Sequence, residues 1–343
     1  SVNPVKIKVI SSATYNSLPD APFKQINDLI ENNDALSYAG PGDRISQDII
    51  REKSFLLDRD ILIKPKEYFL LMNQSIPIET LTPPVNGRTS LFKLESDGDV
   101  CVADLALYKK KYLFWSKEPE INDWIDILKK GNLSEKRDKV PTPLDQPRIK
   151  GQPFIYGRVS GVAIGNKWTA KITNSDNTFN IPEKNNGSSY ALNTVYANTL
   201  GTNQNQSATM EKRYDDTAYQ AHANYGITYQ IEIPLYNDSE SPKNVDISFD
   251  TPLRIGENKP NDRIGFNAKP PEKIAFRGEF KIEYKDNNGN TQEKFVHVVQ
   301  RFGQKGEPLL SILLEPKQLN KVTVTYIYPA DSTPPHVLSI STR

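Results

Sequence analysis

Hydrophobic and polar residues alternate with a period of two through much of the chain. Runs such as VKIKVISS at 5–12, YGITYQIEIPLY at 225–236 and VTVTYIY at 322–328 place apolar or β-branched side chains at alternate positions. This is the period of a β-strand that buries one face. Gly, Pro, Asn and Asp punctuate these runs and favour turns, with hairpins predicted at Asp97-Gly98, Gly165-Asn166 and Asn288-Gly289. The pattern predicts an all-β protein.

Helical periodicity is confined to short segments. In PEINDWIDILKKGN at 119–132, the side chains of Ile121, Trp124, Ile125 and Leu128 fall on one helical face. Two lysines near the end suit the negative pole of a helix, and the glycine that follows can end it. Shorter helical turns are predicted at 23–32 and 43–52.

Two segments of the chain match each other without a gap. Residues 61–84 and 312–335 share Ile-Leu, then Pro-Lys, a later Ile and finally Thr-Pro-Pro at equivalent positions. A proline-bearing turn also enters an alternating strand near Asn3 and again near Ser241. Because proline fixes φ and donates no ladder hydrogen bond, it suits the corners of such a unit. The repeat predicts two β-sandwich (immunoglobulin-like) domains related by duplication, with a short helical connector.

The repeat also sets the expected domain boundaries. We expect a first β-sandwich at 1–112, a helix and proline-rich connector at 113–150, and a second β-sandwich at 151–343. The second sandwich carries a long polar insertion at about 173–226, and such loops are usually functional or disordered. The first strand starts almost at once, so we expect further residues, including an export signal, to precede this sequence.

Composition excludes several classes of protein. Lys and Arg total 43 and Asp and Glu total 42, a balance that argues against nucleic-acid binding. The charges are well mixed along the chain, which argues against a polybasic membrane patch. No apolar run reaches the roughly 18 residues of a transmembrane helix. The single cysteine, Cys101, cannot form an internal disulfide, and its strand-like surroundings predict a small buried side chain.

Longer motifs point to a family. The runs YAGPGDR, LTPPVNGRTSLFKL, KRYDDTAYQAHANYGITYQIEIPLYN, FRGEFKIEY, HVVQRFGQKGEPLL and YPADSTPPHVLSI span nearly the whole chain in order. They resemble an uncharacterised cyanobacterial family, domain of unknown function 3370. The resemblance implies an exported or envelope protein of a cyanobacterium. It implies no activity and supplies no catalytic residues.

The stretch YDDTAYQAHANYG at 214–226 is the sharpest candidate for chemistry. A carboxylate can orient a histidine that acts as a base, so Asp215, Asp216 and His222 are the hypothetical centre of a carbohydrate-active hydrolase. Neighbouring side chains on an extended chain point to opposite faces, however. The favoured interpretation is structural: the aspartates accept backbone N–H bonds in a tight turn, while His222 and Asn224 hold the loop backbone. Calcium held by Asp215 or Asp216 is an open alternative, and no other cofactor is predicted.

A binding interpretation of the same stretch is favoured over catalysis. Aromatic rings stack on the C–H faces of sugars while amides and carboxylates take the hydroxyls. The tentative ligand-binding residues are Tyr214, Asp215, Asp216, Tyr219, His222, Asn224 and Tyr225. Arg277, His297 and Arg301 would add a polar patch if they converge with this stretch.

The leading hypothesis is a non-enzymatic exported protein of the periplasm, outer envelope or extracellular space. It is expected to bind a cell-envelope glycan or a surface protein, or to form part of a cell-surface assembly. Self-assembly through exposed sheet edges is a further expectation, whereas nucleic acid and a transmembrane segment are not expected.

Overall fold

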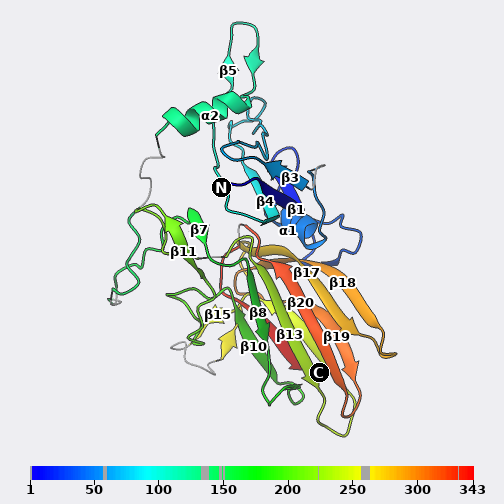
Figure 1. The fold of residues 1–343 in the computed structure, drawn as a ribbon. Coiled ribbons are helices and arrows are strands. Elements are labelled where there is room, and N and C mark those ends of the chain that lie inside the picture. The colour runs from blue at the N-terminus through cyan, green and yellow to red at the C-terminus, as the bar shows by residue number, and fades with distance from the viewer. Residues whose placement is uncertain are drawn as a thin grey trace.

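The computed structural model describes residues 2–56, 60–132, 139–146, 149, 151–222, 224–255, 263–330 and 332–343. These residues are mostly β, with two helices in the described part of the chain (Figure 1). The helices are α1 (Pro41–Ile50) and α2 (Ile121–Lys130). The strands are β1 (Val5–Asn16), β2 (Leu29–Glu31), β3 (Asp60–Ile63), β4 (Arg88–Ser96), β5 (Lys110–Lys111), β6 (Ser116–Lys117), β7 (Gly161–Ala163), β8 (Lys167–Lys171), β9 (Phe179–Asn180), β10 (Gly187–Leu192), β11 (Ala208–Arg213), β12 (Gln220–Ala221), β13 (Thr228–Tyr236), β14 (Lys243–Asp250), β15 (Leu253–Arg254), β16 (Ile264–Gly265), β17 (Ile274–Lys285), β18 (Thr291–Arg301), β19 (Pro308–Leu314), β20 (Leu319–Ile327) and β21 (His336–Thr342).

Two sheets packed face to face form the main body. One runs in the order β2-β18-β17-β20-β13-β8, with β9 also paired to β13, and the other in the order β10-β21-β14-β19. One apolar core contains residues from both sheets, and Phe249 of the smaller sheet packs 5.0 Å, centroid to centroid, from Phe280 of the larger. Burying apolar surface of this kind stabilises a fold by roughly 25 cal/mol per Å². The period-two pattern produces this sandwich because it gives each sheet one apolar face.

Strand β13 shows how the pattern becomes packing. Tyr229, Ile231, Ile233 and Leu235 stand at alternate positions, and all four are fully buried. Gln230 and Glu232 between them lie on the partly exposed face, as the pleat of a strand requires, whereas Pro234 is buried as well. The predicted strand is therefore confirmed together with its buried face.

A smaller three-stranded sheet precedes the sandwich in the chain. Strand β1 lies in its centre, between β3 and β4, and pairs antiparallel with both. Val5, Ile7, Val9 and Ile61 form a small core on it. In the described part of residues 1–112, β1, β3 and β4 form this single sheet, and a duplicated immunoglobulin-like sandwich is not confirmed.

The two matching segments nevertheless adopt the same local geometry. The order β3-β1-β4 parallels β19-β14-β21, with a central strand antiparallel to both neighbours. Ile61 pairs with Ile7, and its equivalent Ile312 pairs with Val245. Ile7 and Val245 are themselves equivalent when the two proline-bearing turns are aligned.

The turn that follows each matched strand is also the same. Lys66 and Lys317 have φ of 62° and 59°. Glu67 N donates to Lys64 O (3.0 Å), and Gln318 N donates to Glu315 O (3.1 Å). After the second turn the chain continues as β20, whereas residues 67–87, which the structure describes, contain no strand. The structural equivalence of the two matching segments therefore covers one strand with its partner and the turn that follows it.

The N-terminal part also contributes to the sandwich. Strand β2 pairs with β18 and extends the larger sheet, while α1 packs against β17 and β20 as well as β1 and β4. Ile45 and Ile49 of α1 share a small core with Ile327 of β20. The segments predicted as separate domains are therefore joined through one sheet.

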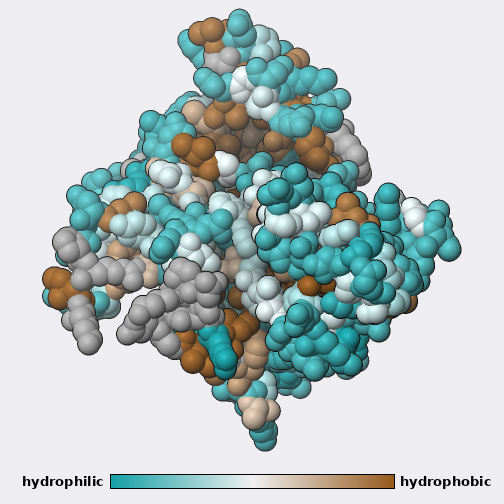
Figure 2. Space-filling model, turned by 90° about the horizontal axis from the view of Figure 1, so that it is seen from below, coloured by the Kyte–Doolittle hydropathy of each residue, from teal (hydrophilic) through white to brown (hydrophobic). Residues whose placement is uncertain are grey.

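At the far end of the molecule from the sandwich, α2 and the β5–β6 hairpin project from the body (Figure 1). Helix α2 has a capping box formed by Glu120 and Asp123, but none of its ten residues is buried. The view from below in Figure 2 shows a mostly hydrophilic surface with separate hydrophobic patches.

Several local predictions can be scored. The helices expected at 43–52 and 119–132 are confirmed as α1 and α2, and the Asn288-Gly289 turn joins β17 to β18. The helical turn expected at 23–32 is wrong, because that segment contains strand β2. Cys101 is exposed, so its predicted burial is also wrong. Gly165-Asn166 connects β7 to β8, which pair with β11 and β13 and do not form a hairpin together.

Candidate functional site

The first half of the 214–226 stretch is a turn closed by its own polar groups. Tyr214 N donates to Thr217 Oγ1 (3.0 Å), and Thr217 Oγ1 donates to Tyr214 O (2.8 Å). The Arg213 guanidinium donates to Tyr214 O and Thr217 O and lies 3.9 Å from the ring centroid of Tyr219. Such side-chain bonds replace ladder hydrogen bonds where a strand ends. Arg213 and Thr217 thus hold the shape of the turn.

The two aspartates and His222 do not form a catalytic arrangement in this structure. Asp215 is exposed, whereas Asp216 is 5% exposed with its Oδ2 3.9 Å from Arg158 Nη2. His222 Nε2 lies 2.6 Å from Gly157 O, and a carbonyl only accepts, so Nε2 carries the hydrogen. Among the described residues, no hydrogen bond links His222 to either aspartate.

The end of the stretch supports the core of the sandwich. Asn224 has φ of 54°, in the left-handed region that Asn tolerates, and is 2% exposed. Its Nδ2 donates to Gln206 O (3.1 Å) and to Tyr229 Oη (2.7 Å). Tyr225 is 54% exposed, and its hydroxyl donates to Ser332 O (3.3 Å). Asn224 is therefore a structural residue, while Tyr214 and Tyr225 present ring surface to solvent.

The predicted patch of Arg277, His297 and Arg301 contacts the N-terminal segment of the chain. His297 is fully buried with its Nε2 2.7 Å from Asp43 Oδ2 of α1. Arg301 binds both carboxylate oxygens of Asp28, at 2.8 and 2.9 Å. The Arg277 guanidinium stands 5.1 Å from the ring centroid of Phe23. Each side chain thus holds part of residues 20–50 against the larger sheet, and none of these three interactions involves residues 214–226.

A buried ion pair lies beside His297, on the neighbouring strand. Glu279, its cross-strand partner on β17, is fully buried and paired with Arg51, which follows α1. Asn32 Nδ2 donates to Glu279 Oε1 (2.9 Å), and Arg51 Nη2 donates to Asn32 O (2.6 Å). Removing one partner of such a pair leaves an uncompensated buried charge. This network explains why the N-terminal segment stays attached to the sandwich.

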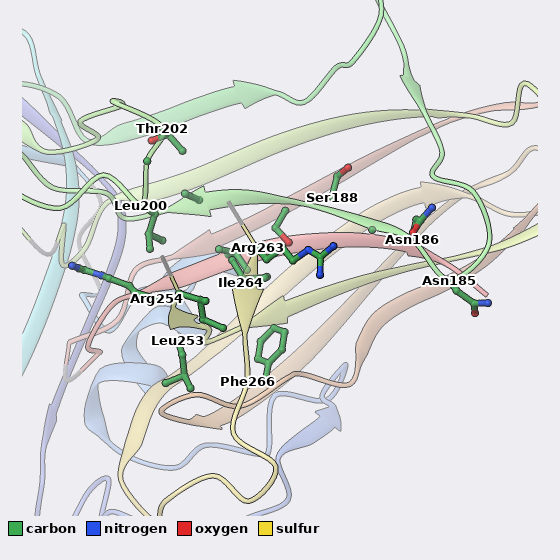
Figure 3. Close-up of a pocket in the computed structure, with 16 residues that line it drawn as sticks. Asn185, Asn186, Ser188, Leu200, Thr202, Leu253, Arg254, Arg263, Ile264 and Phe266 are labelled. Carbon is green, nitrogen blue, oxygen red and sulfur yellow. The ribbon is translucent and has the colours of Figure 1, made fainter. Parts of the chain in front are cut away.

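A groove beside β10, which we call the β10 groove, hollows the described surface. It encloses about 940 Å³ and is lined by four parts of the chain. Figure 3 shows the β10 strand with the residues before it, the loop at 200–202, and the β15–β16 pair with Phe266, and Val337 of β21 is the fourth. Its lining consists of Asn185, Asn186, Gly187, Ser188, Ser189, Ala191, Leu200, Gly201, Thr202, Leu253, Arg254, Ile255, Arg263, Ile264, Phe266 and Val337.

The lining of the β10 groove combines amides, hydroxyls, guanidinium groups and one aromatic ring. Asn185, Asn186 and Ser188 are exposed, and their side chains make no hydrogen bond to other described residues. Arg263 is likewise exposed and makes no ion pair within the described residues. The described lining contains no carboxylate and no histidine. This composition suits recognition of a polar, negatively charged ligand more than acid–base chemistry.

The titratable groups with the most strongly shifted pKa values lie in the core. Burial lowers the pKa of His336 to about 3, so this histidine is neutral, with its Nδ1 3.0 Å from Tyr328 Oη. Burial also raises the pKa of Asp250, against the opposing effect of hydrogen bonds from Ser339 and Gly306 N. His336 packs between the two sheets beside Phe249, whereas Asp250 is buried on the other face of β14 with Ser248 and Ser339; neither lines the β10 groove.

None of the site residues predicted from the sequence lines the β10 groove. The one local signal of the groove is the tripeptide Arg-Ile-Gly, which occurs at 254–256 and again at 263–265. Both arginines of this repeat line the groove. The other wall comes from β10, about sixty residues earlier in the chain, so only the tertiary structure shows that these segments meet.

The described part of the chain contains no cluster of three or more His, Cys, Asp or Glu side chains able to hold a metal ion. Calcium at Asp215 or Asp216 therefore stays a prediction. No helix in the described residues has the length and apolar character needed to cross a membrane.

Comparison with known proteins identifies a family. A family model described as "Protein of unknown function (DUF3370)" matches residues 1–342, which confirms the resemblance seen in the motifs. The comparisons with curated proteins and with solved structures found no match.

Proposed function

The chain belongs to the DUF3370 family, and from this premise we propose that it is a non-enzymatic protein that binds an acidic glycan in the β10 groove. The observation that carries the proposal is the lining itself. Hydrogen-bonding side chains, guanidinium groups and an aromatic ring face a hollow of about 940 Å³, and the described lining has no carboxylate.

Each class of side chain has a role in such a complex. The guanidinium of Arg263 offers a planar pair of donors to a sugar carboxylate. Asn186 and Ser188 can exchange hydrogen bonds with sugar hydroxyls, and the partly exposed ring of Phe266 can stack on a C–H face. The shape also matters, since an open groove accepts an internal stretch of a chain.

The cellular setting forms part of the same proposal. We place the protein in the periplasm, outer envelope or extracellular space of a cyanobacterium, where it binds envelope glycans or surface proteins. Strands β10 and β19 stand at the ends of the smaller sheet among the described strands. An end strand with unpaired backbone groups supports assembly by strand addition.

The internal match supports a further part of the proposal. We attribute the common strand order, register and turn of β3-β1-β4 and β19-β14-β21 to duplication of one immunoglobulin-like unit. No specific observation favours the alternative function, a carbohydrate-active hydrolase at Asp215, Asp216 and His222.

The test measures binding to two polysaccharides that differ in charge. The protein is titrated with polygalacturonate, which is acidic, and with dextran, which is neutral, and reducing-sugar release is followed in the same samples. We expect polygalacturonate to bind, and Arg263→Gln to weaken binding roughly tenfold, because a charge-assisted hydrogen bond is lost.

A matched control separates the site from general charge attraction. Lys8→Gln on β1 removes one positive charge from an exposed position outside the groove and is expected to leave the affinity unchanged. Equal weakening by both variants, or equal affinity for dextran, would contradict the proposal. Release of reducing sugar would establish the hydrolase instead.

A further inference from the structure

The β5–β6 hairpin carries the most exposed cluster of aromatic and aliphatic side chains in the described part of the chain. Leu113 and Phe114 are 89% and 90% exposed, and Tyr108 is 91% exposed. Isolated exposed apolar residues are ordinary, but a contiguous cluster marks an interaction site. We call residues 108–117 the Lys–aromatic hairpin.

The tip of this hairpin is held in a defined shape. Tyr112 N donates to Trp115 O (2.8 Å), which closes a turn with Leu113 and Phe114 at its apex. The rings of Tyr112 and Trp115 stack at 4.2 Å between centroids with 14° between their planes. These contacts present the two most apolar side chains of the turn at its end.

Lysines surround the tip. Residues 108–117 contain Lys109, Lys110, Lys111 and Lys117 and no acidic residue. Three of these lysines form ion pairs with the following segment: Lys109 with Glu118 (2.6 Å), Lys110 with Asp123 (2.6 Å) and Lys117 with Glu120 (2.8 Å). Lys111 is exposed and makes no ion pair among the described residues.

The neighbouring helix is also exposed, and it carries both acidic and basic residues. No residue of α2 is buried, Ile121 and Leu128 are 38% and 45% exposed, and Lys129 and Lys130 stand in its last turn. Figure 1 shows α2 and the hairpin together at the end of the molecule opposite the sandwich, so they can approach a flat surface without obstruction.

We propose that the Lys–aromatic hairpin attaches the protein reversibly to an anionic lipid surface, with Leu113 and Phe114 inserted and the lysines at the headgroups. Trp and Tyr favour the interface between water and lipid, and lysines are attracted by anionic headgroups. A convex, protruding tip fits a deformable lipid surface, whereas a protein partner needs a matching pocket. This attachment goes beyond glycan binding, because it concerns the opposite end of the molecule.

Four lysines lie between residues 109 and 117, and the hairpin brings them together beside an apolar tip. Such a local cluster is compatible with charges that balance over the whole chain.

The test is co-sedimentation of the full chain with lipid vesicles. Vesicles of phosphatidylglycerol mixed with phosphatidylcholine are compared with vesicles of phosphatidylcholine alone. We expect binding to the anionic vesicles, weakened roughly tenfold or more in Leu113→Ser/Phe114→Ser, because both inserted side chains are lost. Lys111→Glu is expected to weaken binding roughly fivefold at low salt, with the difference shrinking as salt screens the attraction.

A matched variant and a local probe complete the experiment. Val162→Ser/Ile164→Ser changes two side chains that are 54% and 62% exposed on the main body and is expected to bind like the native protein. In a Trp124→Phe/Trp168→Phe background, the emission of Trp115 is expected to shift to the blue on binding. Absence of vesicle binding, or equal binding by Leu113→Ser/Phe114→Ser, would overturn the proposal. So would lipid-free self-association that this variant abolishes, since the tip would then be a protein interface.

Discussion

Helices α1 and α2 have the same length, yet they stand in opposite relations to the rest of the molecule. Seven of the ten residues of α1 are buried, whereas none of those of α2 is. Helix α1 is held by tertiary contacts, including the apolar contact with Ile327 and the bond between Asp43 and His297. Helix α2 is held by a capping box and by exposed ion pairs, such as Lys130 with Asp126.

The contrast extends to the regions around each helix. Helix α1 lies against β17 and β20, beside a core whose aromatic side chains are fully buried. Helix α2 lies beside the Lys–aromatic hairpin, where apolar side chains face solvent. An amphipathic sequence therefore specifies a helix in both places, while the surroundings decide whether its apolar face stabilises the fold or remains available to a partner.

The largest expected effect tests this contrast directly. Ile49→Ala in α1 removes a side chain that is 1% exposed, and we expect it to lower the free energy of unfolding by about 2–5 kcal/mol. Leu128→Ala in α2 removes a side chain that is 45% exposed, with an expected loss below about 0.5 kcal/mol. Urea unfolding of both variants measures the difference. Equal losses would show that α2 is buried in solution, and the contrast would fail.

A buried titratable residue of the main body, His336, should also determine part of the pH dependence of the free energy of unfolding. Burial lowers the pKa of His336 in the folded state to about 3, from 6.5 in the unfolded state. Below pH 6.5 the unfolded state therefore binds a proton that the folded state does not. His336 costs stability progressively as the pH falls from 6.5 to about 3, by about 1.4 kcal/mol per pH unit.

The variant His336→Gln removes this titration while keeping a polar side chain near Tyr328. Urea unfolding at a series of pH values should show a shallower loss of stability in the variant between pH 6.5 and 3. Asp250 acts in the opposite direction, because its raised pKa makes the folded state bind a proton first as the pH falls from neutral. At each pH, the free energy of unfolding of the variant is therefore subtracted from that of the native protein, so that the contribution of Asp250 cancels. Parallel curves would show that His336 is accessible to protons in the folded state.

The fold was predictable from sequence where the local pattern and the tertiary environment agree. Strand β13 shows the period of two with its apolar face in the core, and α2 shows clear start and stop signals. The helical turn predicted at 23–32 is wrong. Ile26, Leu29 and Ile30 have helical spacing, but Leu29 to Glu31 form a strand that pairs with β18. A pairing across more than 260 residues overrides local spacing, and no local signal announces it.

The candidate site was less predictable for a related reason. The high density of polar groups at 214–226 is evident from the sequence. In the structure, however, Thr217 stabilises a turn and Asn224 stabilises a loop. The β10 groove joins Ser188 to Arg263, and nothing in the sequence indicates that these residues meet. The residue types indicate which interactions a segment can make. The tertiary structure determines which of its side chains stay exposed and can therefore bind a ligand.

The smallest expected effect compares the two halves of the repeat. Lys66 and Lys317 both adopt a positive φ that L-residues disfavour and glycine accepts. Lys66→Gly should raise the free energy of unfolding by up to about 1 kcal/mol, because glycine adopts the positive φ without strain. No described ion pair of Lys66 is lost in this variant. Lys317→Gly should gain less, since Lys317 Nζ also donates to Asp238 O (2.5 Å) and lies 2.8 Å from Glu240. Chemical denaturation of both variants measures these changes. A larger gain at Lys317 than at Lys66 would show that the two turns differ in strain, and the equivalence of the two halves would be limited to their strand order.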